Sequence, residues 1–205
     1  MNEEKALDTS EMGERTASPT PKKGLLGSII KEIFIFALIA LGIVLPFRLF
    51  VAEPYLVDGR SMDPTFATGQ YLIVNKLSYE LHGTLARGSV VVFKYPNDTS
   101  KNFIKRVIGL PGETVVIRNG EVSIINSEHP EGFALDQTYV VYKSESDNMV
   151  KTLSGDEYFV MGDNRAESFD SRAWGPLNKK YILGEPLLRL FPVTKVSLEP
   201  GKKVL

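Results

Sequence analysis

The stretch "TVVIRNGEVSII", residues 114–125, consists of two short apolar runs joined by Asn119-Gly120. Both runs are rich in β-branched side chains, which favour extended strands. Asn-Gly suits the two-residue turn of a hairpin because both residues tolerate positive φ. The stretch therefore predicts a β-hairpin.

Similar apolar runs, each bounded by turn residues, lie on both sides of this hairpin. They are "QYLIVNKL" (70–77), "GSVVVFKYPN" (88–97), "NFIKRVIGLPG" (102–112), "QTYVVYK" (137–143), "EYFVMGDN" (157–164) and "PLLRLFPV" (186–193). Their composition and spacing predict a mainly β fold with an antiparallel, partly barrel-like sheet. We expect residues 53–117 and 158–205 to form one β domain, with 118–157 as a small β insertion.

An apolar segment precedes the β region. "IFIFALIALGIVLPFRLFV", residues 33–51, carries a single charge, Arg48, and has Pro46 near its end. As a helix it would be about 28 Å long, close to the thickness of the hydrocarbon core of a bilayer. A buried core helix would normally show a polar face, and a cleaved secretory signal has a shorter apolar region. We therefore expect an uncleaved transmembrane anchor over residues 24–52.

Charged residues on either side of the apolar segment indicate its orientation. Lys22, Lys23 and Lys31 precede most of it, whereas Arg48 and Arg60 lie at or beyond its far end. By the positive-inside rule the amino terminus is cytoplasmic, and the β domain lies outside the membrane. The polar residues 1–23 have no apolar periodicity and are expected to form a disordered cytoplasmic tail.

The composition excludes several classes of function. The 205 residues carry a net charge of −1, so no basic surface for nucleic acid is indicated. There is no cysteine, which removes disulfides, thiolate metal sites and cysteine nucleophiles. We see neither a metal-ligand cluster nor a phosphate-binding loop, and no cofactor is expected.

Three polar segments could carry chemistry. They are "VDGRSMDPTF" (57–66) with Ser61, "FIKRVIGLPGE" (103–113) with Lys105, and "GDNRAESFDSRAWGP" (162–176). Strand alternation places Lys105 and Arg106 on opposite faces, so one of the two points toward a buried or cleft side. Burial in an apolar cleft lowers the pKa of a lysine from about 10.4, and a neutral amine can accept the proton of a serine.

Such a Ser/Lys pair needs no histidine. Both histidines of the chain, His82 and His129, lie in polar, turn-like contexts and are expected on the surface. From residue chemistry alone an alternative stays open, in which Ser61 is a turn or helix-cap residue and Lys105 is an exposed strand residue.

Taken together and in this order, the anchor and the three segments resemble the type I signal peptidases, membrane-anchored serine proteases that remove signal peptides from exported proteins. The resemblance implies that Ser61 is the nucleophile, that its backbone N–H binds the oxyanion, and that Lys105 is the general base. It implies that the Ser168 hydroxyl orients the lysine amine. Asp170 and Arg172 would form a supporting ion pair joined by Arg106, on a turn built from Gly162, Asp163, Asn164 and Arg165.

The same resemblance implies cleavage after small residues, as in Ala-x-Ala. The positions that match the substrate pockets are Tyr55, Val57, Met62, Phe103 and Ile104, for which core packing is the alternative. Some family members have a serine two residues before the nucleophile that completes the oxyanion hole, but this chain has Gly59 there. The implied partners are exported preproteins and the lipid bilayer of a bacterial cell membrane; the oligomeric state is not implied.

Three other classes share some of these features. A signal-peptidase-like chaperone for surface structures would lack the Ser/Lys pair. A self-cleaving repressor of the SOS class would carry a DNA-binding domain in place of the anchor. A membrane-tethered β-domain adaptor would leave the polar segment 162–176 unexplained.

Overall fold

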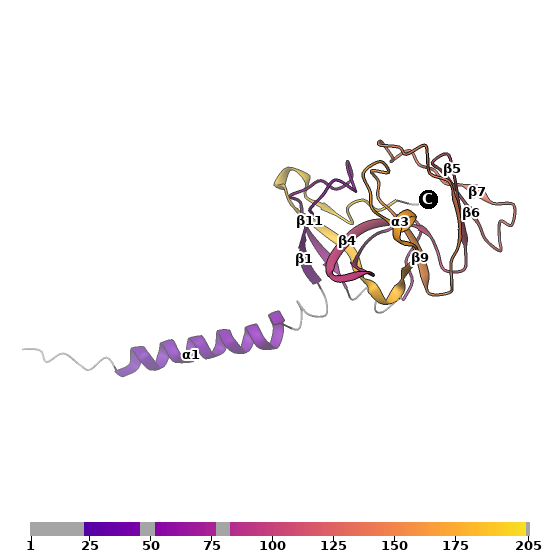
Figure 1. Ribbon diagram of the computed structural model, residues 1–205. Helices are drawn as coiled ribbons and strands as arrows, with labels where there is room; N and C mark the ends of the chain where they lie inside the picture. The colour runs from indigo at the N-terminus through magenta and orange to yellow at the C-terminus, as the bar shows by residue number, and fades with distance from the viewer. Residues whose placement is uncertain (1–22, 46–51, 77–82, 204–205) are drawn as a thin grey trace, which may run out of the picture. The chain divides into compact units, whose positions relative to one another are not determined.

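The computed structural model describes residues 23–45, 52–76 and 83–203 (Figure 1). The expected tail up to residue 22, Pro46 and Arg48 at the end of the apolar segment, and His82 lie outside the described residues. The chain divides into two compact units, residues 1–42 and 43–205.

The first unit contains the apolar helix. Helix α1 (Lys23–Ile39) continues as a wider π-helical turn, η1 (Ala40–Val44). The side chains from residue 27 to 44 are all exposed, and most of them are apolar. Within the described ranges this is the one helix, over Gly27–Val44, that is long and apolar enough to cross a membrane. An all-round apolar surface is typical of a helix whose solvent is lipid.

The second unit is built mainly from antiparallel strands, as the sequence predicts. The larger sheet has the order β1 (Ala52–Leu56), β2 (Tyr71–Asn75), β11 (Ile182–Phe191), β3 (Val90–Tyr95), β4 (Asp98–Gly109), β9 (Glu157–Met161) and β10 (Leu177–Asn178), with β12 (Ser197–Leu198) beside β11. Figure 1 shows β4 as a long curved strand.

Strand β11 links the two halves of this sheet. Its first residues pair with β3, and from Glu185 onward it pairs with β2. The change of partner occurs at Gly184, where an added Cβ would lie 2.1 Å from the carbonyl oxygen of Asn75. The glycine therefore permits the close approach that bends the sheet.

A smaller sheet has the order β7 (Phe133–Ala134), β6 (Glu121–Ile125), β5 (Thr114–Arg118) and β8 (Met149–Thr152). Arg118 pairs with Glu121 across the turn, and Asn119 and Gly120 have φ of 50° and 80°. The predicted hairpin is therefore confirmed. This sheet starts at Thr114, whereas the predicted insertion starts at residue 118, the last residue of β5.

Strands β4 and β9 contribute residues to two separate hydrophobic clusters, one on each face. Ile108, Phe159 and Met161 pack with the buried face of the small sheet, and Val107 and Val160 pack in the core of the large sheet. A third cluster lies beneath the segment that carries Ser61 and consists of Val57, Met62, Phe66, Leu72 and Val90. Short helices α3 (Ser171–Trp174), η3 (Lys179–Tyr181) and η4 (Val193–Lys195) connect the later strands.

The strand expected over residues 137–143 is not formed. The backbone turns instead, with Val140 N–H donating to the carbonyl of Gln137 at 2.9 Å. The side chains of Gln137 and Tyr139 both accept hydrogen bonds from Arg165. Buried Arg165 needs hydrogen-bond acceptors, and its bonds to Gln137 and Tyr139 outweigh the local strand preference of this apolar run.

Candidate active site

Ser61 begins a tight turn that is anchored by the core beneath it. Gly59, with φ of +97°, redirects the chain after β1, and Phe66 N–H then donates to the carbonyl of Met62 at 2.9 Å. Met62 and Phe66 are 1% and 0% exposed. Since two large apolar residues hold the turn from below, the Ser61 hydroxyl has a defined position.

Lys105 reaches this hydroxyl from the middle of β4. Its Nζ donates to Ser61 Oγ at 2.8 Å and to the carbonyl of Ile104 at 3.0 Å. Lys105 is only 4% exposed. Burial lowers the pKa of this amine to about 8, an effect that Asp170 and Asp163 oppose and Arg172 assists. The amine therefore releases its proton far more readily than an ordinary lysine.

Arg106 points to the opposite face of β4 and is fully buried. Its Nε and Nη2 donate to the two carboxylate oxygens of Asp163 at 2.8 and 2.5 Å. We expected Arg106 to join Asp170 and Arg172, and that expectation is wrong because the alternation of β4 aims it at Asp163. Asp163 also accepts a hydrogen bond from Thr65 Oγ1 at 2.6 Å, which ties β4 to the Ser61 turn.

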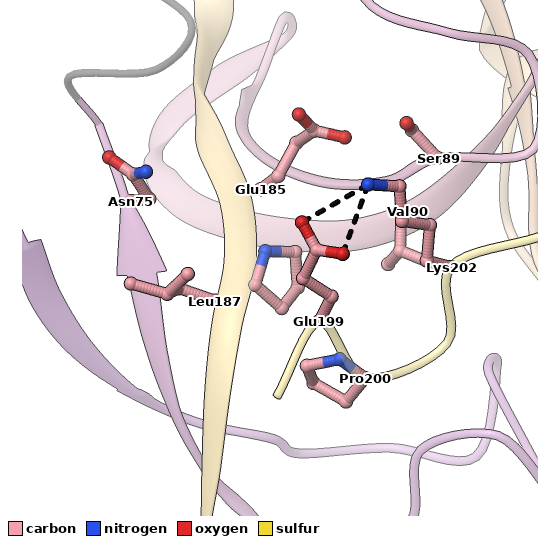
Figure 2. Close-up of a pocket in the computed structure, with 9 residues that line it drawn as sticks. Asn75, Ser89, Val90, Glu185, Leu187, Glu199, Pro200 and Lys202 are labelled. Carbon is pink, nitrogen blue, oxygen red and sulfur yellow. Dashed lines mark hydrogen bonds and ion pairs between the residues drawn. The ribbon is translucent and has the colours of Figure 1, made fainter. Parts of the chain in front are cut away.

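Two backbone carbonyls complete the surroundings of Arg106. Its Nη1 donates to Gly88 O at 2.7 Å and to Gly201 O at 2.6 Å. Gly201 belongs to the C-terminal turn, where Lys202 Nζ pairs with the Glu199 carboxylate at 3.1 and 3.0 Å beside a pocket of about 60 Å³ (Figure 2). The turn that contains Gly201 thus helps to hold β4, the strand that carries Lys105, through Arg106.

Asp170 and Arg172 form the expected ion pair. Arg172 Nε and Nη2 donate to Asp170 Oδ1 and Oδ2, each at 2.8 Å, and Gly162 N–H donates to Oδ2 at 3.0 Å. Burial alone would raise the pKa of Asp170, but the hydrogen bonds and charge of Arg172 outweigh it and lower the pKa. Asp170 stays ionised near Lys105. Arg172 Nη1 also pairs with Asp147 at 2.5 Å.

Gly162 begins the loop between β9 and α3, residues 162–170, which we call the late loop, and it lies against Ser61. An added Cβ would lie 2.3 Å from Ser61 O and 2.3 Å from Ser168 Oγ, so only glycine fits. Ser168 Oγ is buried near the Asp170 carboxylate, and its hydroxyl helps to lower the pKa of Asp170. The structure thus places Ser168 at the site, but the bond to Lys105 that the resemblance implies is not formed, since Nζ donates to Ser61 and Ile104 instead.

Asn164 holds the backbone at Arg60 and Ser61. Its N–H donates to Ser61 O at 3.1 Å, and its Nδ2 donates to Arg60 O at 3.1 Å. Arg165 braces the same loop by donating to Gly162 O at 3.1 Å and to the Tyr139 hydroxyl at 3.1 Å. The predicted turn from Gly162 to Arg165 therefore positions the Ser61 backbone directly.

Sequence reasoning missed several contributors, among them Thr65, Tyr139 and Gly201. The Tyr139 ring lies 4.6 Å from the guanidinium carbon of Arg106, and the other two bind the Arg106–Asp163 pair as described above. Neither the residue type nor the neighbouring sequence of these three positions indicates a role at the site. The separations of 98 residues for Thr65–Asp163 and 95 for Arg106–Gly201 leave no local pattern that could have identified them.

A cleft of about 490 Å³ lies beside the Ser61–Lys105 pair. Four of the five expected pocket residues line it, namely Tyr55, Val57, Phe103 and Ile104, together with Leu56, Asp58, Gly59, Arg60, Leu72, Val92, Asn102, Glu167 and Phe169. Met62 does not line the cleft, because its side chain fills the core below the Ser61 turn. The interpretation of Met62 as a packing residue therefore fits the structure.

One edge of β4 is open beside this cleft. On that edge β9 pairs with β4 only from Arg106 onward, opposite Met161. Among the described residues, those that precede Arg106 in β4 pair only on their other edge, with β3. A strand-like peptide could therefore form main-chain hydrogen bonds with the residues that lead to Lys105.

Comparison with known proteins identifies signal peptidases among the relatives of this chain. The family model described as "Signal peptidase, peptidase S26" matches residues 30–191. The probable signal peptidase I-1 of Synechocystis sp. is 37% identical over 173 residues, which are 81% of this chain and 85% of the relative. Signal peptidase I V of Bacillus subtilis is 41% identical over 138 residues, 63% of this chain and 80% of the relative.

A solved structure of a signal peptidase I from Enterococcus faecalis is 27% identical, with a TM-score of 0.43. The match covers 50% of this chain and 96% of that one.

Proposed function

Because the chain belongs to the signal peptidase family, peptidase S26, and is a serine endopeptidase that cleaves signal peptides, we propose that Ser61 is its nucleophile and Lys105 its general base. The observation that carries this proposal is the 2.8 Å separation of Lys105 Nζ and Ser61 Oγ, with Lys105 buried. A nucleophile within hydrogen-bond reach of a base that is neutral near working pH is the arrangement that serine acylation requires.

In the acylation step, neutral Lys105 accepts the proton of the Ser61 hydroxyl while Oγ attacks the carbonyl carbon of the scissile peptide bond. The resulting tetrahedral intermediate carries a negative oxygen. Lys105, now an ammonium, donates its proton to the leaving nitrogen, and the C–N bond breaks. The products are an ester of Ser61 with the signal peptide and a mature protein with a new amino terminus.

In the deacylation step, Lys105 is again neutral and accepts a proton from a water molecule that attacks the ester carbonyl. The second tetrahedral intermediate collapses as Lys105 returns the proton to Ser61 Oγ. The signal peptide leaves with a free carboxylate, and the enzyme is restored. The low pKa of Lys105 serves both steps because the same amine accepts and donates a proton in each.

Fixed donors must stabilise the oxyanion in both steps. We assign one of them to the Ser61 backbone N–H, whose position is set by the hydrogen bonds from Asn164 to the carbonyls of Arg60 and Ser61. A preorganised donor of this kind contributes about 3 kcal/mol of transition-state stabilisation. Gly59 has no hydroxyl to offer as a second donor.

The cleft accounts for a preference for small side chains before the scissile bond. Val57 belongs to the cluster beneath the Ser61 turn and Ile104 packs against it, so both side chains have fixed positions on the walls of the cleft. The peptide would lie along the open edge of β4, held by main-chain hydrogen bonds that do not depend on its sequence. The resemblance to signal peptidases implies substrates of the form Ala-x-Ala, and the apolar walls of the cleft are compatible with small apolar side chains.

Residues 53–117 and 158–205 are assigned to the catalytic β domain and 118–157 to the small β insertion. Ser61 comes from the turn between β1 and β2 and Lys105 from β4, while the insertion contributes Tyr139 and Asp147 as supports. The insertion therefore braces the site without entering the cleft.

A bacterial cell membrane is the proposed location, with a cytoplasmic amino terminus and the catalytic domain outside. The exposed apolar helix over Gly27–Val44 supports an anchor. A second apolar surface supports contact with lipid: Leu56, Tyr71 and Phe191 are paired across β1, β2 and β11 and are 55%, 48% and 52% exposed. Signal peptides that emerge from the bilayer would meet the enzyme at this surface.

The test uses the full-length protein in liposomes with a preprotein that carries an Ala-x-Ala site. The parent should cut after the second alanine, and Ser61→Ala and Lys105→Ala should lower the rate by at least about 10³-fold. Lys101→Ala is a matched control, because Lys101 lies on the same strand with an exposed side chain. A parent that binds the preprotein without cutting it would favour the chaperone alternative, and activity in Ser61→Ala would refute the assigned nucleophile.

A further inference from the structure

The Ser61–Lys105 pair lies at one end of the apolar walls of the cleft. Tyr55, Leu56 and Val57 form one apolar wall, and Phe103 and Ile104 form the other. The first segment continues through Arg60 to Ser61, and the second continues to Lys105. A peptide whose scissile bond lies at Ser61 can place only one half between these walls. That half is the signal-peptide side, because the walls are apolar.

The other half of the peptide must leave over the late loop. Beyond Lys105 the edge of β4 is occupied, since Arg106 pairs with Met161 of β9. The chain then turns at Gly162 toward Ser61, and Glu167 of this loop lines the cleft together with Arg60. The first residues of the mature protein therefore pass between Arg60 and Glu167.

These two residues have fixed backbones and adaptable side chains. Asn164 accepts a hydrogen bond from Glu167 N–H at 3.1 Å and donates to Arg60 O at 3.1 Å. Arg60 Nη1 lies 3.4 Å from a Glu167 carboxylate oxygen, yet the side chains are 59% and 54% exposed. An ion pair that is this exposed is weak and can exchange partners.

The two charges differ in their other contacts. Arg60 Nε also pairs with Asp63 at 3.2 Å, so its charge remains compensated when Glu167 turns to a substrate. Among the described residues, Glu167 forms an ion pair with Arg60 alone. The carboxylate of Glu167 is therefore the group best placed to select the charge of a passing peptide.

We propose that Glu167 determines specificity on the mature side of the cleavage site, where it favours a cationic over an anionic residue at the first two positions after the scissile bond. This inference rests on the proposed function, since it uses Ser61 to fix the position of the peptide. The ammonium group formed at the new amino terminus would meet the same carboxylate as the product leaves.

The test measures kcat/KM for preproteins that differ only at the second mature position, with Lys, Gln or Glu. Exposed charges that interact at this range change rates by a few fold each, so the parent should prefer Lys over Glu by about three- to tenfold at low salt. Glu167→Gln should bring this ratio close to one, and Glu167→Lys should invert it. Arg60→Gln should increase it, because the competing cation is gone.

Glu131→Gln is the matched control, because Glu131 is a 73% exposed carboxylate beside the small sheet. It should leave the ratio as in the parent. A second control places the charged residue about ten positions after the cleavage site, where the ratio should be one. A preference that persists in Glu167→Gln, or a parent without preference, would overturn the inference.

The experiment distinguishes failure of the proposed function from failure of the role assigned to Glu167. If the parent does not cut even the Gln preprotein in a Ser61-dependent manner, the proposed function is wrong. If it cuts all three preproteins equally well and Ser61→Ala cuts none, the function stands and only the role of Glu167 is refuted.

Discussion

Replacing Gly162 by alanine tests the contact between the late loop and the nucleophile. The new Cβ would lie 2.3 Å from Ser61 O and 2.3 Å from Ser168 Oγ, whereas ordinary contacts begin at 3.4 Å. Ser61 O belongs to the backbone of the Ser61 turn, which cannot rotate away as a side chain can. The loop or the Ser61 turn must therefore move by about 1 Å, as overpacked sites do.

A displacement of this size has a calculable effect on catalysis. Misplacing reacting groups by about 1 Å lowers rates about 100-fold, which corresponds to about 2.7 kcal/mol in the barrier. Overpacking should also lower the free energy of unfolding by about 1–3 kcal/mol. Because the Tyr55–Val57 and Phe103–Ile104 walls are untouched, KM should change little and most of the loss should appear in kcat.

The assay is single-turnover cleavage of an Ala-x-Ala preprotein with enzyme in excess, combined with thermal unfolding in detergent. Gly155→Ala is the matched control, because Gly155 lies in the turn before β9 with no atom within 4 Å of an added Cβ. The double variant Gly162→Ala/Ser168→Gly removes the contacts with Ser168 and leaves the clash with Ser61 O. Gly162→Ala with more than a third of parental kcat and unchanged unfolding would refute the reasoning.

Three further outcomes follow from the charges at the site. The acidic limb of the kcat/KM profile should have its midpoint near pH 8, because activity rises as Lys105 loses its proton; a midpoint near 10.5 would contradict the lowered pKa. Lys105→Met should raise the free energy of unfolding by up to about 3 kcal/mol at pH 7, at about 1.4 kcal/mol per pKa unit. Since the folded pKa lies below the unfolded one, this gain is largest below pH 8 and vanishes above about 10.5, which urea titrations at several pH values can check. Asp163→Asn should lower the free energy of unfolding by about 3–5 kcal/mol, because Arg106 would be buried without its carboxylate. The exposed pair of Lys101 with Asp98 supplies the control, and equal effects of Asp163→Asn and Asp98→Asn on the unfolding midpoint would count against that reasoning.

Local periodicity was enough to predict the fold class. The Asn119-Gly120 hairpin, most of the strands and the exposed apolar helix are all properties of short windows, in which each residue's face follows from its neighbours. The same reasoning correctly placed Lys105 and Arg106 on opposite faces of one strand. It failed at 137–143, where two contacts with a distant buried arginine outweigh the local preference for a strand.

The resemblance singled out Ser61 and Lys105, but their 2.8 Å contact depends on the tertiary structure. The order of strands, the register of β4 against β9 and the core under the Ser61 turn jointly set that distance. The partners of Arg106 were beyond prediction for the same reason, since Asp163 and Gly201 reach it from 57 and 95 residues away. A sequence pattern specifies which way a side chain points, whereas the closure of long loops decides what it meets.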